Sequence, residues 1–171
     1  GNIALVLGAG VSNGIGLPSW KELVIKCGNN AKLDTSKIIN SDNENELMEF
    51  IDKIEEKKSY KQFIGIIYKS LYSGLEREQY YDKIIQKKLL MALGAMIMGA
   101  KRGSVNEVVT LNFDNVLENY LKIHGYCSNI VYKLPYLKDN SDVTIYHING
   151  FIPFNDKSNC NDFIKFNKKS F

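Results

Sequence analysis

Cysteine is scarce in this sequence, and the few copies present are scattered. Cys27, Cys127 and Cys160 lie far apart and form no Cys-x-x-Cys pair. Zinc modules built from cysteine need such closely spaced pairs, so a zinc knuckle is excluded and we expect no bound metal. Three scattered cysteines are typical of a reducing cytosol rather than of a disulfide scaffold. We therefore expect a cytoplasmic protein.

Long hydrophobic runs and a strong charge of either sign are missing as well. The longest apolar run covers residues 89–100, whereas a transmembrane helix needs about 20 residues. We interpret this run as a buried helix and expect no contact with a membrane. The formal net charge is only +3, without a dense basic block, so the sequence gives no reason to expect direct nucleic-acid binding.

The composition and the hydrophobic pattern indicate one α/β domain. The chain has 171 residues, of which 44% are hydrophobic, enough for a sizeable core. The apolar pattern predicts strands at residues 3–7, 107–111, 129–134 and 143–148, with the first fully buried. It predicts helices at residues 19–27, 44–58, 60–72, 76–101 and 114–123. This order favours a Rossmann-like, mostly parallel sheet with helical cover and a helical insertion at about 44–101.

A glycine-rich turn follows the first predicted strand. The stretch Leu7 to Trp20 reads LGAGVSNGIGLPSW, and Ser19 and Glu22 have the spacing of a capping box at the start of a helix. A strand, a glycine turn and a helix in this order suit a bound phosphate. A tight strand-to-helix turn without any ligand explains the same residues, and Asn13 stands where a G-x-G-x-x-G motif has its third glycine.

Polar residues follow three of the predicted strands. Gly8–Ser12 follows the first strand, Asn112–Asp114 follows the second, and His147–Gly150 ends the last. In an open parallel sheet, ligands bind beyond the carboxyl ends of the strands, so we expect the three groups to meet there. Taken singly, TLNFD also fits a helix cap, and His147 also fits a structural histidine.

Together these segments resemble the conserved boxes of the Sir2 superfamily. GAGVS with GIGLPSW, TLNFD and YHINGFIP occur in the order of that family, and they resemble most the SIR2-like domains of bacterial anti-phage defence proteins. Deacylating sirtuins have Asp-Phe-Arg after the proline, where this chain has Ser19 and Trp20, and they carry a four-cysteine zinc module. The sirtuin histidine directly precedes a glycine, a place held here by Asn149, with His147 two residues earlier.

The resemblance implies an NAD+ hydrolase with NAD+ as its substrate. The resemblance also implies that Asn112, Asp114 and His147 are the catalytic residues. Asp114 would hold the nicotinamide carboxamide, Asn112 would orient the ribose or the attacking water, and His147 would accept a proton. The cofactor-binding residues implied are Gly8, Ala9, Gly10, Ser12, Pro18, Trp20, Phe113 and Asn149.

The resemblance also implies a biological setting. The chain would be the N-terminal part of a SIR2-like NAD-binding domain over residues 1–171, with its sheet incomplete. Hydrolysis would deplete NAD+ in antiviral defence by abortive infection, under control of a homo-oligomer or a regulatory partner such as a phage protein activator or an associated defence subunit. A non-catalytic nucleotide-sensing or scaffolding subunit is the main alternative, and an NAD-dependent protein deacylase is a further one.

Overall fold

The computed structural model describes residues 3–99, 105–133, 135, 140–155 and 164. The chain forms two compact units. Unit 1 comprises residues 1–15 and 75–164, and unit 2 comprises residues 16–74 and 165–171. Within the described residues, none of the helices combines the length and the hydrophobicity that crossing a bilayer requires.

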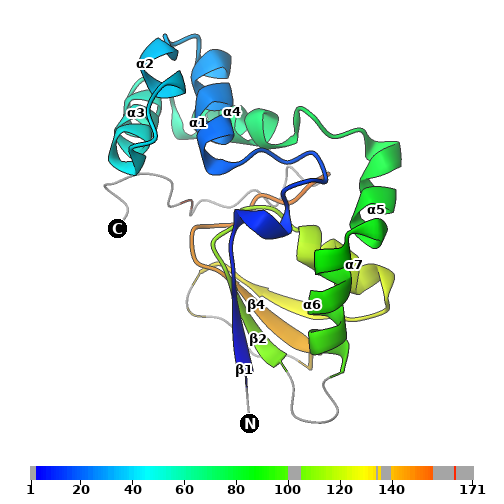
Figure 1. The fold of residues 1–171 in the computed structure, drawn as a ribbon. Coiled ribbons are helices and arrows are strands. Elements are labelled where there is room, and N and C mark those ends of the chain that lie inside the picture. Colours follow the sequence, from blue (N-terminus) through cyan, green and yellow to red (C-terminus); the bar gives the residue numbers. More distant parts are fainter. Residues whose placement is uncertain (1–2, 100–104, 134, 136–139, 156–163, 165–171) are drawn as a thin grey trace. The chain divides into compact units, whose positions relative to one another are not determined.

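Unit 1 is a Rossmann-like α/β fold, which confirms the predicted fold class. Its sheet has four parallel strands in the order β1-β2-β4-β3. The strands are β1 (Ile3–Leu7), β2 (Val105–Thr110), β3 (Ser128–Val131) and β4 (Val143–His147). Its helices are η1 (Ala9–Val11), α5 (Arg77–Gln86), α6 (Lys88–Met98) and α7 (Val116–Ile123). Figure 1 shows α5, α6 and α7 on the same side of the sheet.

The core of unit 1 lies between the sheet and these helices. Alternate residues of β4, namely Val143, Ile145 and His147, are buried, whereas Thr144 and Tyr146 are half-buried. Successive side chains of a strand point to opposite faces, so the fully buried set faces the helices. The predicted helix at residues 114–123 is present as α7, which buries the apolar residues Val116, Leu117, Tyr120 and Leu121.

The first strand is not fully buried, contrary to the prediction. Only Leu7 of β1 is buried, and Val6 is 72% exposed. The apolar run IALVL is typical of a strand covered on both faces. In the described sheet, however, β1 is an edge strand that pairs only with β2, so it has fewer neighbours to cover it.

The predicted long helix at residues 76–101 is wrong, because two helices occupy this stretch. Helix α5 ends at Gln86 and α6 begins at Lys88, since Lys87 takes an extended conformation with ψ of 110°. Within residues 89–99, the described part of the apolar run, the chain is also only partly buried. Leu90 and Ile97 face the core, whereas Met91 and Met96 are each 45% exposed.

Unit 2 is a helical unit with well-defined helix starts. Its helices are α1 (Trp20–Ala31), α2 (Ser36–Ile39), α3 (Glu44–Glu56) and α4 (Tyr60–Tyr72). The Ser19 hydroxyl accepts from the Glu22 N–H at 3.4 Å, and the Ser19 N–H donates to the Glu22 carboxylate at 2.7 Å. These bonds confirm the predicted capping box, which satisfies backbone donors at the start of α1. The helices predicted at residues 44–58 and 60–72 are present as α3 and α4, and their apolar residues are buried: Leu47, Phe50, Ile51, Ile54, Phe63, Ile64, Ile67 and Leu71.

The division into units follows different bounds from the predicted insertion. Helices α1 and α2, which precede residue 44, belong to unit 2 together with α3 and α4. Helices α5 and α6, which the predicted insertion includes, belong to unit 1 and contribute to its core.

Candidate functional site

The carboxyl ends of β1, β2 and β4 lie next to one another in unit 1. Leu7 pairs with Thr110, and Thr110 pairs with His147, so the last residues of the three strands form one row. Because the strands are parallel, the segments that follow them leave the sheet at the same edge. The expected convergence of the three polar groups is therefore confirmed. This edge is where ligands bind in open α/β sheets.

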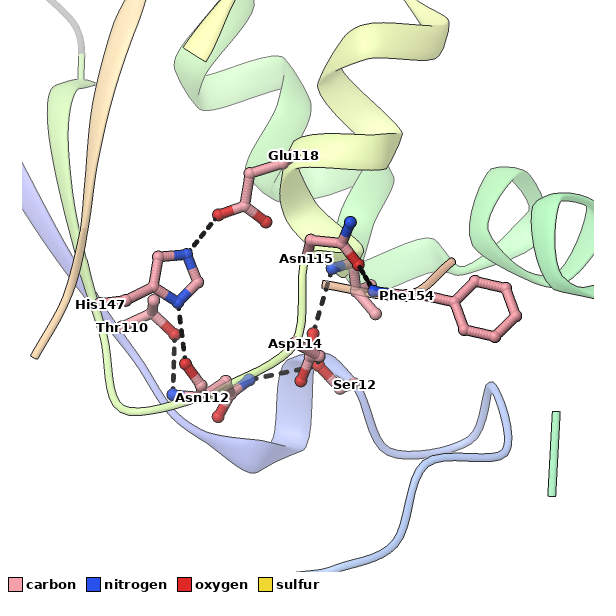
Figure 2. Close-up of polar contacts among 9 residues, drawn as sticks. Ser12, Thr110, Asn112, Asp114, Asn115, Glu118, His147 and Phe154 are labelled. Carbon is pink, nitrogen blue, oxygen red and sulfur yellow. Dashed lines mark hydrogen bonds and ion pairs between the residues drawn. The ribbon is translucent and has the colours of Figure 1, made fainter. Parts of the chain in front are cut away.

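A chain of hydrogen bonds joins the first two polar groups (Figure 2). The Asn112 amide donates to the Gly8 carbonyl at 3.1 Å and to the Ser12 hydroxyl at 3.2 Å. The Ser12 hydroxyl in turn donates to Asp114 Oδ1 at 2.8 Å. The Val116 N–H donates to the same oxygen at 3.1 Å, so this carboxylate also binds the first backbone N–H of α7, although the N-cap position itself is Asn115. The Asp114 carboxylate therefore contacts both Ser12 and the first turn of α7.

His147 lies buried between Glu118 and Asn112, as Figure 2 shows. Its ring is 1% exposed. Nε2 lies 2.6 Å from Glu118 Oε1, and Nδ1 lies 2.9 Å from the backbone carbonyl oxygen of Asn112. The ring also meets the edge of Phe151, with centroids 4.6 Å apart. Both ring nitrogens therefore have protein partners in this arrangement.

The pKa values of the two buried groups shift for identifiable reasons. Burial alone would lower the pKa of His147, but the Glu118 carboxylate and the Asn112 carbonyl raise it above 6.5. Burial raises the pKa of Asp114 above 3.8, against the opposing bonds from Ser12 and the Val116 N–H. The charge of Glu118 raises it further. The neutral form of Asp114 and the charged form of His147 are both favoured relative to free side chains.

A small cavity lies inside this cluster. Its volume is about 10 Å³, roughly the room that one water molecule needs. The polar side chains that line it are Ser12, Thr110, Asn112, Asp114, Glu118 and His147. The cavity is too small for a nucleotide, so a ligand at this edge would contact the rim, where Asn112 is only half-buried.

Asn149 has an unsatisfied acceptor beside this edge. Its Nδ2 donates to the Leu111 carbonyl at 3.0 Å, which ties the segment after β4 to the segment after β2. Its Oδ1 is buried and has no hydrogen-bond partner among the described residues. A buried polar atom without a partner costs free energy, and native sites that carry one call for an explanation such as a ligand.

The remaining predicted residues lie in three settings. Gly8 directly precedes η1, and the exposed residues Ala9 and Gly10 belong to it. A side-chain carbon placed on Gly8 or Gly10 would meet no atom of the described chain within 4 Å. Phe113 is buried, and its carbonyl accepts from the Ile152 N–H at 2.7 Å. Pro18 and Trp20 belong to unit 2, just before and at the start of α1.

Glu118 is a site residue that the sequence reasoning missed. It is 7% exposed and lies on the buried face of α7. One signal was available, because positions 117, 118 and 121 share a helical face, and an acidic residue beside Leu117 and Leu121 breaks an apolar pattern. A buried carboxylate is almost always paired, which would have directed attention to the two histidines of the chain.

No family model and no curated protein matches this chain. Fold and site together define a Rossmann-like α/β protein with a polar cluster at the carboxyl edge of its sheet. The resemblance to SIR2-like domains stays a prediction.

Proposed function

We propose that this chain binds NAD+ at the carboxyl edge of its sheet and hydrolyses the nicotinamide–ribose bond. The observation that carries the proposal is the hydrogen-bonded row of Ser12, Asn112 and Asp114 after β1 and β2. In Rossmann-like folds this edge receives nucleotides, and the open space over Gly8 and Gly10 lets a pyrophosphate approach the backbone. The Oδ1 of Asn149, which has no hydrogen-bond partner among the described residues, would accept a hydrogen bond from the ligand.

The chemistry of the reaction suits these residues. Nicotinamide leaves a positively charged nicotinamide riboside unit as a neutral molecule, so the step needs no strong general acid, and positive charge develops on the ribose. Asp114 is hydrogen-bonded to Ser12 beside Asn112, and its carboxylate would stabilise such charge when ionised. Both bonds to Asp114 end on Oδ1, so Oδ2 would receive the carboxamide N–H. Asn112 would position the attacking water or the ribose.

His147 has a different role in this proposal from the one its position in the sequence suggested. Both of its nitrogens contact oxygen atoms of the protein, and the ring is buried. A general base must reach the proton that it removes. The proposal therefore assigns no proton transfer to His147, and the attacking water meets a cationic ribose that needs little base assistance.

The resemblance supplies the biological part of the proposal. The activity would deplete NAD+ in the bacterial cytoplasm during anti-phage defence by abortive infection. The site would stay inactive until a homo-oligomer or a regulatory partner, such as a phage protein activator or an associated defence subunit, forms with it.

A second candidate is a nucleotide sensor that binds NAD+ without hydrolysing it. The observation that favours it is the same burial of His147, because the chain then lacks an accessible histidine at the site. Asn149 holds the position where the resemblance expects one, and an amide cannot accept a proton at neutral pH. Binding would be retained in this case, since it uses the backbone of Gly8–Ser12 and the side chain of Asn112.

Nicotinamide release from NAD+ tests the proposal. In its activated, oligomeric or partner-bound state, the chain is expected to release nicotinamide, measured by proton NMR, and Asn112→Ala is expected to slow release by about a hundredfold because the reacting groups lose their orientation. Asn106→Ala is the matched control, since Asn106 is an exposed residue of β2. Full activity of Asn112→Ala would exclude the assigned site. Saturable NAD+ binding without release would favour the sensor.

A further inference from the structure

We propose that His147, held by Glu118, is an imidazolium that positions Asn112 for the ligand. The inference takes its ligand, NAD+, from the proposed function. The contacts of His147 with Glu118 and Asn112 lie within unit 1 and do not depend on that function. His147 connects the end of β4 to the segment after β2 through Asn112, and to α7 through Glu118 (Figure 2). Neither His147 nor Glu118 is assigned to touch NAD+, so both act as positioning residues.

The partner atoms determine where the protons lie. The Asn112 carbonyl oxygen can only accept, so Nδ1 must carry a proton to make its 2.9 Å bond. The Glu118 carboxylate oxygen, 2.6 Å from Nε2, accepts as well when it is ionised. Both nitrogens then donate, and the ring is positively charged. The one other arrangement with the same bonds is a neutral ring that accepts from a protonated Glu118.

The charges around the ring favour the imidazolium. Glu118 of α7 touches it, and Asp114, in the segment before α7, acts on it as a second carboxylate. Tyr80 of α5 is a further titratable group near both carboxylates, and burial raises the pKa of its phenol, so it stays neutral. When Glu118 is ionised, loss of the ring proton leaves its buried negative charge uncompensated.

The ring acts on the ligand through Asn112. The Asn112 N–H donates to Thr110 Oγ1 at 3.1 Å, and its side chain binds Gly8 and Ser12. The His147 bond holds the backbone carbonyl of the same residue. When the ring loses its proton, the bond to Glu118 loses its hydrogen and the lone pair of Nε2 faces a carboxylate. The ring then shifts, and the Asn112 carbonyl loses its fixed position.

Ring nitrogen NMR of the isotope-labelled full chain tests the protonation state. At pH 7 both nitrogens of His147 are expected to show the imidazolium signature, and the carbonyl carbon of Asn112 is expected to follow the His147 titration with the same midpoint. The exposed His124 is the only other histidine, so His124→Gln assigns the spectrum and leaves the His147 midpoint unchanged. A neutral His147 ring at pH 7, or an Asn112 carbonyl that does not follow it, would overturn the proposal.

Glu118→Gln removes the charge of the side chain at position 118 and keeps nearly the same size and shape. Glutamine keeps an acceptor oxygen but loses the charge, so the His147 midpoint is expected to fall by about 1 to 3 pH units. Above the new midpoint, NAD+ binding is expected to weaken about tenfold, and lowering the pH is expected to restore it, which a purely structural role would not predict. An unchanged midpoint, or weak binding at every pH, would contradict the positioning role. If Glu118→Gln does not fold, the wild-type titration decides. If wild type does not bind NAD+, the proposed function fails. The ring titration still decides whether His147 is an imidazolium coupled to the Asn112 carbonyl.

Discussion

Glu118 and His147 lie in surroundings where neither could stay charged alone. Their side chains are 7% and 1% exposed, and desolvation of a buried charge costs several kcal/mol. Pairing offsets this cost, so removal of one partner is expected to destabilise the fold by about 3 to 5 kcal/mol. For this reason Asn112, which is half-buried and uncharged, is the better residue for testing activity without loss of the fold.

The stability of the chain is expected to depend on the protonation of His147. Its pKa is raised on folding, so the stabilisation is complete below about pH 6.5 and is lost as the pH rises through the folded value. The loss amounts to about 1.4 kcal/mol for each pH unit by which the folded pKa exceeds 6.5. Denaturant unfolding between pH 6 and about pH 9 measures it.

His147→Gln and His124→Gln are the controls for this pH dependence. The fall in unfolding free energy above pH 6.5 is expected to persist in His124→Gln and to disappear in His147→Gln. A wild-type chain whose stability rises through this range relative to His147→Gln would contradict the assigned direction of the pKa shift. The raised pKa of Asp114 acts in the same sense at lower pH, from 3.8 upward.

Single residues of the site could be predicted only where the chain marks them locally. Asn112 and Asp114 follow a strand directly, and their sequence position is enough to place them at the sheet edge. The partnership of His147 with Glu118 joins residues 29 positions apart, from a strand and from the first turns of a helix. No local pattern contains that pairing, because it arises from the packing of α7 on the sheet.

At the scale of elements, a substitution in the segment between β1 and α1 is expected to change ligand affinity while leaving the unfolding free energy almost unchanged. Gly10→Ala is expected to change the unfolding free energy by no more than about 0.5 kcal/mol, since its new methyl group meets no atom of the described chain within 4 Å. The same methyl group would occupy the space that the proposed pyrophosphate approaches. We therefore expect NAD+ to bind about tenfold more weakly, measured by calorimetry.

Gly65→Ala is the matched control for this variant. Gly65 lies within α4, where an added carbon also meets nothing within 4 Å, and alanine favours a helix over glycine. Its NAD+ affinity is expected to equal that of wild type. Unchanged affinity in Gly10→Ala would show that no ligand approaches this turn.

Helix starts were predictable from the sequence, whereas one helix end was not. Ser19 and Ser59 both form capping boxes, and such caps depend on residues three positions apart. The break between α5 and α6 occurs at Lys87, without proline or glycine. The Lys87 ammonium donates to the Asn13 carbonyl, so a contact distant in the sequence accompanies the break.

At the scale of the whole molecule, the order of strands decides where the polar groups meet. Parallel pairing of β1 with β2 and of β2 with β4 brings segments more than 100 residues apart to one edge. The alternation of strands and helices predicts a parallel sheet, and hence a shared edge, without any alignment. Which strand is the edge strand depends on long-range pairing, and this is why the burial of β1 was predicted wrongly.

The most direct test of the central proposal is a chemical-shift map of NAD+ binding to the labelled full chain. Backbone amides of Gly8, Ser12, Asn112 and Asn149 are expected to shift saturably with NAD+, with the largest changes centred on these residues. The same spectra show whether free nicotinamide accumulates. Absence of saturable shifts, or shifts confined to α2, α3 and α4 of unit 2, would contradict an NAD+ site at the carboxyl ends of β1, β2 and β4.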